Sequence, residues 1–443
     1  MAGATPMEHV KAWVVSADMG FGHHRAVYPL RAIAEGEILT VGINDATSPK
    51  ERRLWRHILG IYEFFSRAKS IPVIGKRVFG ILDQLLHIPS FYPIRNLSDS
   101  TFQVSLLESY INKGLCTGML DRIRTKRLPL VTSFYAPAIA ADMHGSDKVY
   151  CIICDADLNR VWVARNPWES RIDYLAPCAT AAARLKAYGV PEGRIHLTGF
   201  PLPVELLGGR DLSVLKSDLG RRLRVLDPND KFWPRHGINV EHFLGADNCV
   251  QPERKTFTIM YSVGGAGAQR EIGRRIAFSL RTRILTQQVK LVLSAGVKES
   301  VREYFYGVKK ELGAGDEDVE VVFGKTSDAY FDAFNSALHA TDILWTKPSE
   351  LSFYCGLGIP IVMTPAIGSQ EKFNRRWLQE IHAGTRQLNP DYTDQWLFDL
   401  LRKGHFAEAA WSGFLKARKL GTFNIMELVE TGRMPRETSP IMR

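Results

Sequence analysis

The stretch that decides the fold is residues 341–374, TDILWTKPSELSFYCGLGIPIVMTPAIGSQEKFN. Its two apolar runs, 343–345 and 359–363, are typical of buried strands, and each is followed by polar residues and a helical stretch. Strands and helices that alternate in this way form a parallel α/β sheet, which binds ligands at the C-terminal ends of its strands. Glu350 opens the first helical stretch, where a carboxylate suits the hydroxyls of a ribose.

The same alternation runs through most of the chain and predicts two α/β halves. Apolar runs that predict strands occupy residues 10–17, 38–44, 129–134, 148–154, 171–175, 195–198, 256–263, 289–294 and 319–323, besides the two above. We expect an N-terminal domain over 1–205, a linker or insertion over 206–255, and a C-terminal domain over 256–443 that ends in closing helices. A ligand is expected in the cleft between the two domains.

Composition sets the broad class. The chain has 443 residues, of which 45% are hydrophobic and 23% charged, with a net charge of +10. This is an ordinary globular composition, and the basic balance points to an anionic partner such as a nucleotide, a nucleic acid or an acidic membrane. Six cysteines without regular spacing predict no disulfide framework and favour a cytosolic chain. We expect neither a signal peptide nor a membrane-spanning helix.

A glycine turn follows the first predicted strand, in the sequence Gly20-Phe-Gly22-His23-His24. Glycines between a strand and a helix allow close approach of a ligand, and the helix N-terminus offers free N–H groups to an anion. His23 directly follows the second glycine, so we expect it at the turn, where an imidazole can take a proton from a hydroxyl. A tight turn without a ligand remains an alternative.

The end of the strand at 148–154 carries Cys151, Cys154, Asp155 and Asp157. The two cysteines have C-x-x-C spacing, but positions i and i+3 of a strand point to opposite faces, so we interpret them as buried structural thiols. The two aspartates follow at the functional edge of the sheet.

The segment from about 50 to 95 is basic and aromatic. Between Lys50 and Arg77 it has eight basic residues and two acidic ones, interleaved with residues such as Trp55, Tyr62 and Phe65. This pattern suits a membrane interface, and core-facing helices with a solvated basic face are an equally good interpretation.

The second half opens with a glycine-rich loop, Gly264-Gly265-Ala-Gly267-Ala-Gln269, between a predicted strand and a helix. Such a loop cradles phosphate with its backbone N–H groups and the helix N-terminus. It is not a P-loop, because no Gly-Lys-Ser/Thr follows.

Taken in order, these motifs resemble the GT-B glycosyltransferases, in particular the group of monogalactosyldiacylglycerol synthases, processive diacylglycerol glucosyltransferases and the peptidoglycan lipid-intermediate N-acetylglucosaminyltransferase. The similar motifs are Gly20-Phe-Gly22-His23-His-Arg-Ala26, Cys154-Asp155, Thr198-Gly-Phe-Pro201, Gly264-Gly265-Ala-Gly267, Lys347-Pro-Ser-Glu350, Gly358-Ile-Pro360, and Gly368-Ser-Gln370-Glu371 with Asn374. The resemblance covers most of residues 12–200 and 256–385, and it implies two Rossmann-like domains facing across a cleft, with C-terminal helices packing back toward the N-terminal domain.

The resemblance also implies roles for individual residues. Glu350 would bind the ribose, Gln370 and Glu371 the sugar hydroxyls, and Gly324 would lie near the base. The remaining donor-binding residues would be Gly264, Gly265, Gly267, Lys347, Gly368 and Asn374. His23 would act as the base at the acceptor hydroxyl, with Asp155 as a second candidate. The acceptor side would include Gly20, Gly22, Trp55, Tyr62 and Phe65.

The function that the resemblance implies is inverting transfer of a hexose from a nucleotide diphosphate sugar, expected to be a UDP-hexose, to a lipid or membrane-associated acceptor. Such enzymes need neither a metal nor another cofactor. The expected partners are the nucleotide sugar, the acceptor and an anionic membrane surface, but no nucleic acid, and the expected location is the cytoplasm, peripherally on the inner face of the cell membrane. A sugar-nucleotide epimerase of the same fold, or a non-catalytic nucleotide-sugar-binding protein, are the alternatives.

Overall fold

The structure is a computed structural model. It describes residues 10–43, 47–68, 88–251, 256–264, 267, 269–366, 368–437, 439, 441 and 443, with the side chains of 59 and 61–68 excepted.

The chain forms two compact units, each built on a parallel six-stranded sheet. The first unit comprises Met1–Pro201, Gly368–Gln370 and Leu420–Thr438. The second comprises Leu202–Ile367, Glu371–Lys419 and Ser439–Arg443. The strand orders are β2-β1-β3-β4-β5-β6 and β12-β11-β10-β7-β8-β9. The predicted fold class, α/β with two parallel sheets, is therefore confirmed.

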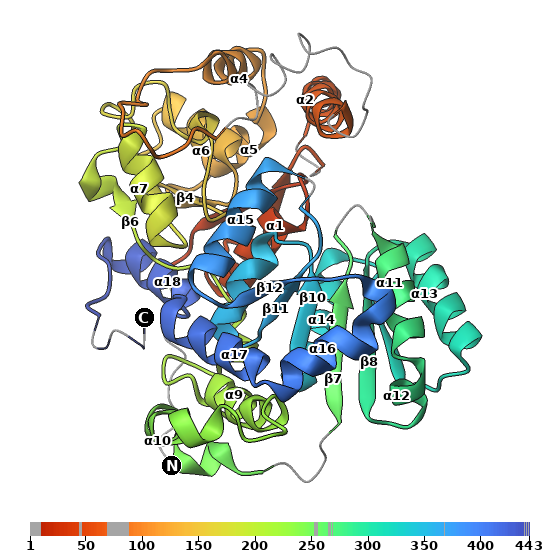
Figure 1. Cartoon of the computed structure of the whole chain (residues 1–443). Helices are drawn as coiled ribbons and strands as arrows, with labels where there is room; N and C mark the ends of the chain where they lie inside the picture. Colours follow the sequence, from red (N-terminus) through yellow and green to blue (C-terminus); the bar gives the residue numbers. More distant parts are fainter. Residues whose placement is uncertain are drawn as a thin grey trace, which may run out of the picture. The chain divides into compact units, whose positions relative to one another are not determined.

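Figure 1 labels many of the elements of both units. The strands of the first unit are β1 (Trp13–Ala17), β2 (Leu39–Val41), β3 (Leu130–Thr132), β4 (Val149–Ile152), β5 (Ile172–Leu175) and β6 (Ile195–His196). Its helices are α1 (Phe21–Val27), η1 (Tyr28–Ile33), α2 (Pro49–Ala68), α4 (Phe102–Asn112), α5 (Thr117–Ile123), α6 (Tyr135–Met143), η2 (Arg160–Trp162), α7 (Ala179–Ala187), η3 (Glu192–Arg194) and α18 (Gly421–Thr431).

The strands of the second unit are β7 (Phe257–Ser262), β8 (Val289–Gly296), β9 (Val319–Phe323), β10 (Ile343–Thr346), β11 (Ile361–Met363) and β12 (Gly384–Arg386). Its helices are α8 (Val204–Leu207), α9 (Ser213–Val225), α10 (Trp233–Leu244), η4 (Ala246–Cys249), α11 (Arg270–Ser279), α12 (Arg281–Leu285), α13 (Glu299–Leu312), α14 (Ser327–Ala340), η5 (Glu350–Leu357), α15 (Ser369–Glu380), η6 (Pro390–Tyr392), α16 (Thr393–Arg402) and α17 (His405–Lys416).

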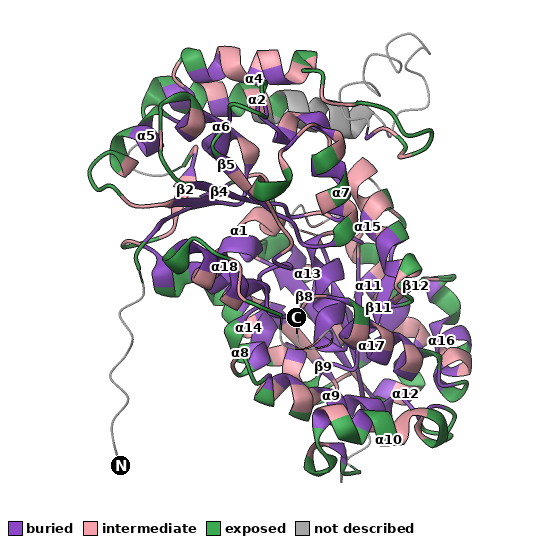
Figure 2. Ribbon diagram, turned by 90° about the vertical axis from the view of Figure 1, so that its left-hand side faces the viewer, coloured by how far each residue is buried: buried purple, intermediate pink, exposed green. Residues whose placement is uncertain are grey.

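The central strands are buried on both faces, as the continuous apolar runs predict. Every residue of β1, β7 and β10 is buried, and Figure 2 shows the strands of both sheets among the buried parts of the chain. Parallel sheets are covered by helices on both faces, which is why their strands lack an alternating polar pattern. The edge strand β12, with the sequence Gly-Thr-Arg and an exposed Arg386, lacks such a run and was not predicted.

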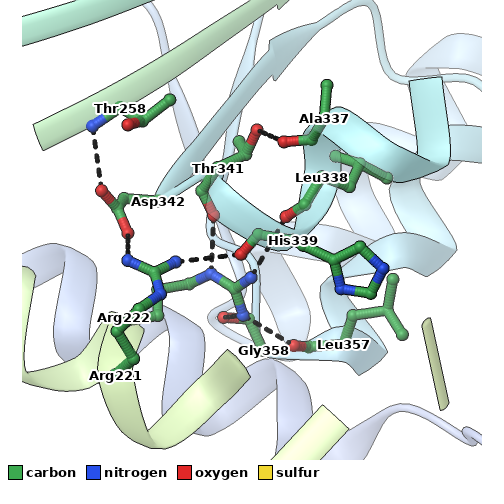
Figure 3. Close-up of polar contacts among 10 residues, drawn as sticks. All are labelled: Arg221, Arg222, Thr258, Ala337, Leu338, His339, Thr341, Asp342, Leu357 and Gly358. Carbon is green, nitrogen blue, oxygen red and sulfur yellow. Dashed lines mark hydrogen bonds and ion pairs between the residues drawn. The ribbon is translucent and has the colours of Figure 1, made fainter. Parts of the chain in front are cut away.

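The segment 206–255, predicted as a linker or insertion, contributes α9 and α10 to the second unit. Arg222 of α9 is 1% exposed and donates hydrogen bonds to four backbone carbonyls. The acceptors are Thr341 (2.8 Å), Leu357 (3.1 Å), Gly358 (3.4 Å) and Leu338 (3.5 Å). Figure 3 shows how these carbonyls converge on the guanidinium.

The neighbouring Arg221 completes this network. It donates to Asp342 Oδ1 at 3.0 Å, and Asp342 Oδ2 accepts the backbone N–H of Thr258 at 2.9 Å (Figure 3). Thr258 and Asp342 stand at the N-terminal ends of β7 and β10. Helix α9 is therefore bonded to the edge of the sheet opposite the strand C-termini.

Of the three helices near the end of the chain, α16 and α17 pack in the second unit and α18 in the first. Asn424 of α18 donates to the Thr198 carbonyl at 2.9 Å, and Tyr150 of β4 donates to the Leu428 carbonyl at 3.4 Å. Helix α18 is thus part of the first unit, although the chain between Pro201 and Leu420 belongs to the second unit except for Gly368–Gln370.

None of the helices among the described residues combines the length and the apolarity that crossing a bilayer requires.

Candidate functional site

The second unit has its topological switch point between β7 and β10. From β7 the chain continues outward through β8 and β9, and it then returns to add β10, β11 and β12 on the other side. At such a point the chain leaves the two adjacent strands toward opposite sides of the sheet. The loops that follow these strands therefore diverge and leave a crevice at the strand C-termini. The two loops here are the glycine-rich loop after β7 and the Lys347–Glu350 segment after β10. Both predicted donor motifs therefore flank the point where a doubly wound sheet binds its ligand.

The glycine-rich loop turns sharply before it enters α11. The Gly267 N–H donates to the Gly264 carbonyl at 2.7 Å, and Gly267 has φ +70°, which a residue with a side chain rarely adopts. Helix α11 then begins at Arg270, so its unpaired N–H groups lie at the end of this turn. Gly265 lies outside the described residues.

Gln269 fixes the exit of that loop and was not predicted as a site residue. Its carbonyl accepts the Tyr261 hydroxyl at 2.6 Å, and its Oε1 accepts the Thr364 hydroxyl at 2.9 Å. These contacts join the glycine-rich loop to the loop after β11. Sequence reasoning missed Gln269 because its role depends on contacts with Tyr261 and Thr364, which come from other parts of the chain.

Lys347 lies against the glycine-rich loop. A Cβ atom at Gly264 would lie 2.7 Å from Lys347 Cε and 3.3 Å from Lys347 Nζ. Lys347 Nζ donates to Glu371 Oε1 at 3.0 Å. The structure therefore brings together three of the predicted donor residues, Gly264, Lys347 and Glu371, which come from three separate segments.

Glu350 and Asn374 complete this part of the site. Glu350 is the first residue of η5 and is 8% exposed. Asn374 of α15 is buried and donates to the Pro348 carbonyl at 3.2 Å. Asn374 thus holds the backbone between Lys347 and Glu350.

Three other predicted donor residues are Gly324, Gly368 and Gln370. Gly324 follows β9, and a Cβ atom there would lie 2.2 Å from the Tyr330 amide nitrogen, so the absence of a side chain lets α14 pack on the strand. Gly368 and Gln370 stand at the start of α15 and group with the first unit.

The first unit has the equivalent switch point between β1 and β3. His23 lies in α1, three residues into the helix that follows β1, and so stands within the helix rather than at the turn before it. Its Nδ1 lies 2.7 Å from the carbonyl oxygen of Ser133, the residue after β3. His23 thus bridges the two loops that flank the switch point.

This hydrogen bond defines the tautomer of His23. A carbonyl oxygen only accepts, so Nδ1 carries the proton and Nε2 keeps its lone pair. Burial lowers the pKa of His23 to about 4, although the hydrogen bond to Ser133 opposes this effect. The imidazole is therefore neutral at neutral pH, with its Nε2 able to accept a proton.

Aromatic rings and a thiol surround His23. Its ring packs edge-to-face on Phe134 at 4.9 Å and lies 6.2 Å from Trp162. Cys154 Sγ lies 3.7 Å from His23 Nδ1 and is buried. Cys154 was predicted within a strand, but β4 ends at Ile152, which places this thiol beside the imidazole rather than in the strand.

The two aspartates after β4 differ. Asp155 is half-buried. It is the next residue after Cys154, whose thiol lies beside the His23 ring. Asp157 is buried and accepts two hydrogen bonds from Arg184, at 2.8 Å and 2.9 Å. Asp157 therefore serves the core, and only Asp155 is left as the second candidate base.

The glycine turn before α1 is held by His24. Its Nδ1 lies 3.2 Å from the Ser16 hydroxyl, and its Nε2 lies 3.8 Å from Asp18 Oδ1. Its hydrogen bond with Asp18 lowers the pKa of that carboxyl group. Gly20 has φ +110°, which only glycine adopts readily, whereas Gly22 lies inside α1.

The basic aromatic segment is described only in part. Trp55 is 3% exposed, donates to Glu51 Oε1 at 3.2 Å, and lies 6.4 Å from the Phe134 ring. It belongs to the core, as one of the two interpretations expected. The side chains of Tyr62 and Phe65, and residues 69–87, lie outside the described residues. On the same helix, Lys50, Arg52, Arg53 and Arg56 are exposed and form a basic face.

A cavity of about 300 Å³ opens in the first unit beside η2. Thr101, Asn159, Arg160 and Tyr188 are among its lining residues. It contains none of the residues predicted for the donor or the acceptor side.

The cysteines and acidic residues form no metal centre within the described ranges, where groups of three or more His, Cys, Asp or Glu side chains with suitable spacing are absent. All six cysteines are buried and none forms a disulfide.

No protein-family model and no curated protein sequence matches this chain. Among solved structures, the S. aureus MnaA–UDP complex is similar with a TM-score of 0.49 and 12% identity, covering 97% of this chain and 100% of the other. MurG of Acinetobacter baumannii has a TM-score of 0.43 and 13% identity, over 73% and 78% of the two chains. The Streptomyces sp. SF2575 glycosyltransferase SsfS6 has a TM-score of 0.41 and 11% identity, over 96% and 100%. At such identities and TM-scores, these likenesses assign neither a substrate nor an activity to this chain.

Proposed function

We propose that this protein is a GT-B glycosyltransferase that moves a hexose from a nucleotide diphosphate sugar, UDP-hexose by preference, to a lipid or membrane-associated acceptor. The second unit binds the donor and the first unit supplies the base. The observation that carries this proposal is the switch point of the second unit, where a glycine turn, a helix N-terminus and the Lys347 ammonium converge. Backbone N–H groups and a cation at one sheet edge are the elements that recognise a diphosphate.

The donor is held by groups of distinct chemistry. Diphosphate oxygens accept hydrogen bonds from the backbone N–H groups at the start of α11, and Lys347 supplies a positive charge beside Gly264. The Glu350 carboxylate accepts hydrogen bonds from the ribose hydroxyls. Glu371 and Gln370 do the same for the hexose.

The reaction is a single displacement. The acceptor hydroxyl oxygen forms a bond to the anomeric carbon while the bond from that carbon to the diphosphate oxygen breaks, so the anomeric configuration inverts. His23 Nε2 takes the hydroxyl proton. The negative charge that develops on the leaving diphosphate is met by Lys347 and the N-terminus of α11, and the proposal therefore needs no metal cofactor.

Two features of the first unit support a membrane-associated acceptor. Helix α2 exposes four basic side chains, and α4 packs against it through the Tyr110 hydroxyl, 3.1 Å from His57 Nδ1. The large apolar side chains of Tyr92, Ile94 and Phe102 are exposed just before and at the start of α4. Basic residues attract anionic lipid, and exposed aromatic and aliphatic side chains enter the interface.

A flotation experiment tests the membrane proposal. We expect the protein to float with liposomes containing anionic phospholipid at low salt and to remain at the bottom of the gradient with neutral liposomes. The double variant Arg53→Glu/Arg56→Glu should float at least tenfold less, since each basic residue near the surface contributes about 1 kcal/mol. The control Arg433→Glu/Arg436→Glu carries the same charge change on exposed residues and should float like the wild type. Equal loss in both double variants, or no flotation of the wild type, would contradict the proposal.

A thermal-shift experiment tests the donor site. We expect UDP at about 100 times its Kd to stabilise the wild type by about 2.7 kcal/mol, a Tm shift of roughly 5–10 °C. Glu350→Ala should remove most of this shift, because the ribose loses its acceptor, and the isosteric Glu350→Gln should reduce it, because an amide oxygen accepts more weakly than a carboxylate. Glu303→Ala, an exposed residue of α13, is the control and should keep the full shift. ADP and GDP in parallel identify the base, and a full shift in both Glu350 variants would refute the donor site.

A further inference from the structure

The proposed donor site contains an ion pair between Lys347 and Glu371. A nucleotide sugar would need both residues as binding partners. Lys347 Nζ donates to Glu371 Oε1 at 3.0 Å, while the Lys347 stem covers the backbone of Gly264. Lys347 comes from the loop after β10 and Glu371 from the first turn of α15. The pair therefore connects the segment beside Gly264 with α15, the helix that carries Glu371.

A buried asparagine joins the two segments that carry this pair. Asn374, one turn after Glu371, donates to the Pro348 carbonyl at 3.2 Å and ties α15 to the residue after Lys347. The Lys347 side chain is 32% exposed, so a ligand can reach its ammonium. The lysine stem is flexible and its ammonium has three donors, which suits a change of partner.

A diphosphate at the 264–267 turn would compete with Glu371 for Lys347. Two anions near one ammonium repel each other, and the diphosphate carries more charge than the carboxylate. The diphosphate would also be held by the N-terminus of α11, an advantage that the Glu371 carboxylate lacks. Binding of the diphosphate therefore favours transfer of Lys347 from Glu371 to phosphate.

We propose that Lys347 and Glu371 form an exchange pair that makes hexose recognition depend on the diphosphate. In the ligand-free protein the Lys347 ammonium is paired with the Glu371 carboxylate. When a nucleotide diphosphate takes Lys347, Glu371 is released to accept hydrogen bonds from the hexose hydroxyls. This inference rests on the proposed function, and it predicts that Glu371 opposes binding of the nucleotide alone while it favours binding of the nucleotide sugar.

Calorimetric titration with UDP and with UDP-glucose tests this sign reversal. In Glu371→Gln the diphosphate no longer competes with a carboxylate for Lys347, so UDP should bind about 1.5- to 5-fold tighter than in the wild type, the range that corresponds to one partly exposed ion pair. The advantage of UDP-glucose over UDP should fall several-fold, because the neutral amide accepts hydrogen bonds from the hexose hydroxyls more weakly than the carboxylate and has one acceptor oxygen instead of two. Glu380→Gln removes the same charge from an exposed residue of α15 that pairs with Arg376, and both affinities should stay at the wild-type values.

A double-mutant cycle separates exchange from a general charge effect. In a Lys347→Gln background, Glu371→Gln should no longer tighten UDP binding, since the competition has already been removed. Circular dichroism and Tm confirm that each variant is folded. If Glu371→Gln weakens UDP or leaves it unchanged, or tightens it equally in both backgrounds, the exchange pair is refuted while the donor site stands. If the folded wild type binds neither UDP nor UDP-glucose, the proposed function itself fails.

Discussion

His23→Gln is expected to reduce the release of UDP from UDP-hexose, in the presence of a membrane lipid extract as acceptor, by about 10²- to 10⁴-fold. Glutamine fills similar space and can still donate to the Ser133 carbonyl, but it cannot take up a proton. The proposed donor site lies in the other unit, so the Tm shift with UDP should stay at the wild-type size. Loss of turnover with intact nucleotide binding is the signature of a base.

His24→Gln is the matched control for this variant. It removes an imidazole from the next position of α1, where the ring contacts Ser16 and Asp18 instead of Ser133. We expect turnover within about threefold of the wild type. If His23→Gln also retains turnover within this range and Asp155→Asn does not, the base is Asp155. If neither variant loses turnover, the catalytic part of the proposal is wrong.

The lowered pKa of His23 adds a pH test. The wild-type rate should be independent of this group from about pH 6 to 8 and should fall as the pH drops toward 4, because the protonated ring cannot act as a base. The free energy of unfolding should also fall as the pH falls. An unfolded histidine has a pKa near 6.5, so between about pH 6.5 and 4 it binds more protons than His23 does in the folded protein. The contribution of His23 to stability is thus fully present above this window and is lost as the pH falls through it. Urea unfolding at pH 7 and pH 5 should show a smaller loss for His23→Gln than for the wild type.

Arg222→Met is expected to lower the free energy of unfolding of the second unit by about 3–5 kcal/mol. Methionine has a similar length but no donors, so the carbonyls of Thr341, Leu357 and Gly358 would be left unpaired in a buried place (Figure 3). Burial lowers the pKa of Arg222 to about 10, which still leaves the guanidinium charged at pH 7. At about 2–4 °C per kcal/mol for a unit of this size, Tm should fall by roughly 10 °C.

Lys216→Met makes the same change of charge on the same helix, at a half-buried position whose side chain makes no hydrogen bond to the described residues. Its Tm should change by less than about 2 °C. Calorimetry on the whole chain would show the effect of Arg222→Met in the transition of the second unit. A Tm within 2 °C of the wild type for Arg222→Met would mean that α9 is not held to the sheet through this side chain.

The sequence by itself determined the two α/β halves, because buried parallel strands require uninterrupted apolar runs, and the runs at 319–323 and 343–345 lie within or match β9 and β10. It also placed Gly264 and Lys347 after strands, since glycine turns and polar residues mark strand ends. It did not reveal β12, whose three residues carry no apolar run, and it did not show that residues 206–255 contribute helices to the second unit.

Only the tertiary structure decided which of these residues meet. The partner of His23 is a backbone carbonyl 110 residues away, and a carbonyl has no signature in the sequence. Lys347 and Glu371 meet because β10 and β11 are neighbours in the sheet, and the α9 segment belongs to the second unit because Arg222 finds carbonyls from three places. The local sequence pattern indicates which face of a helix or strand is buried. Which side chains contact one another depends on the order of the strands in the sheet, and that order is set by packing over the whole chain.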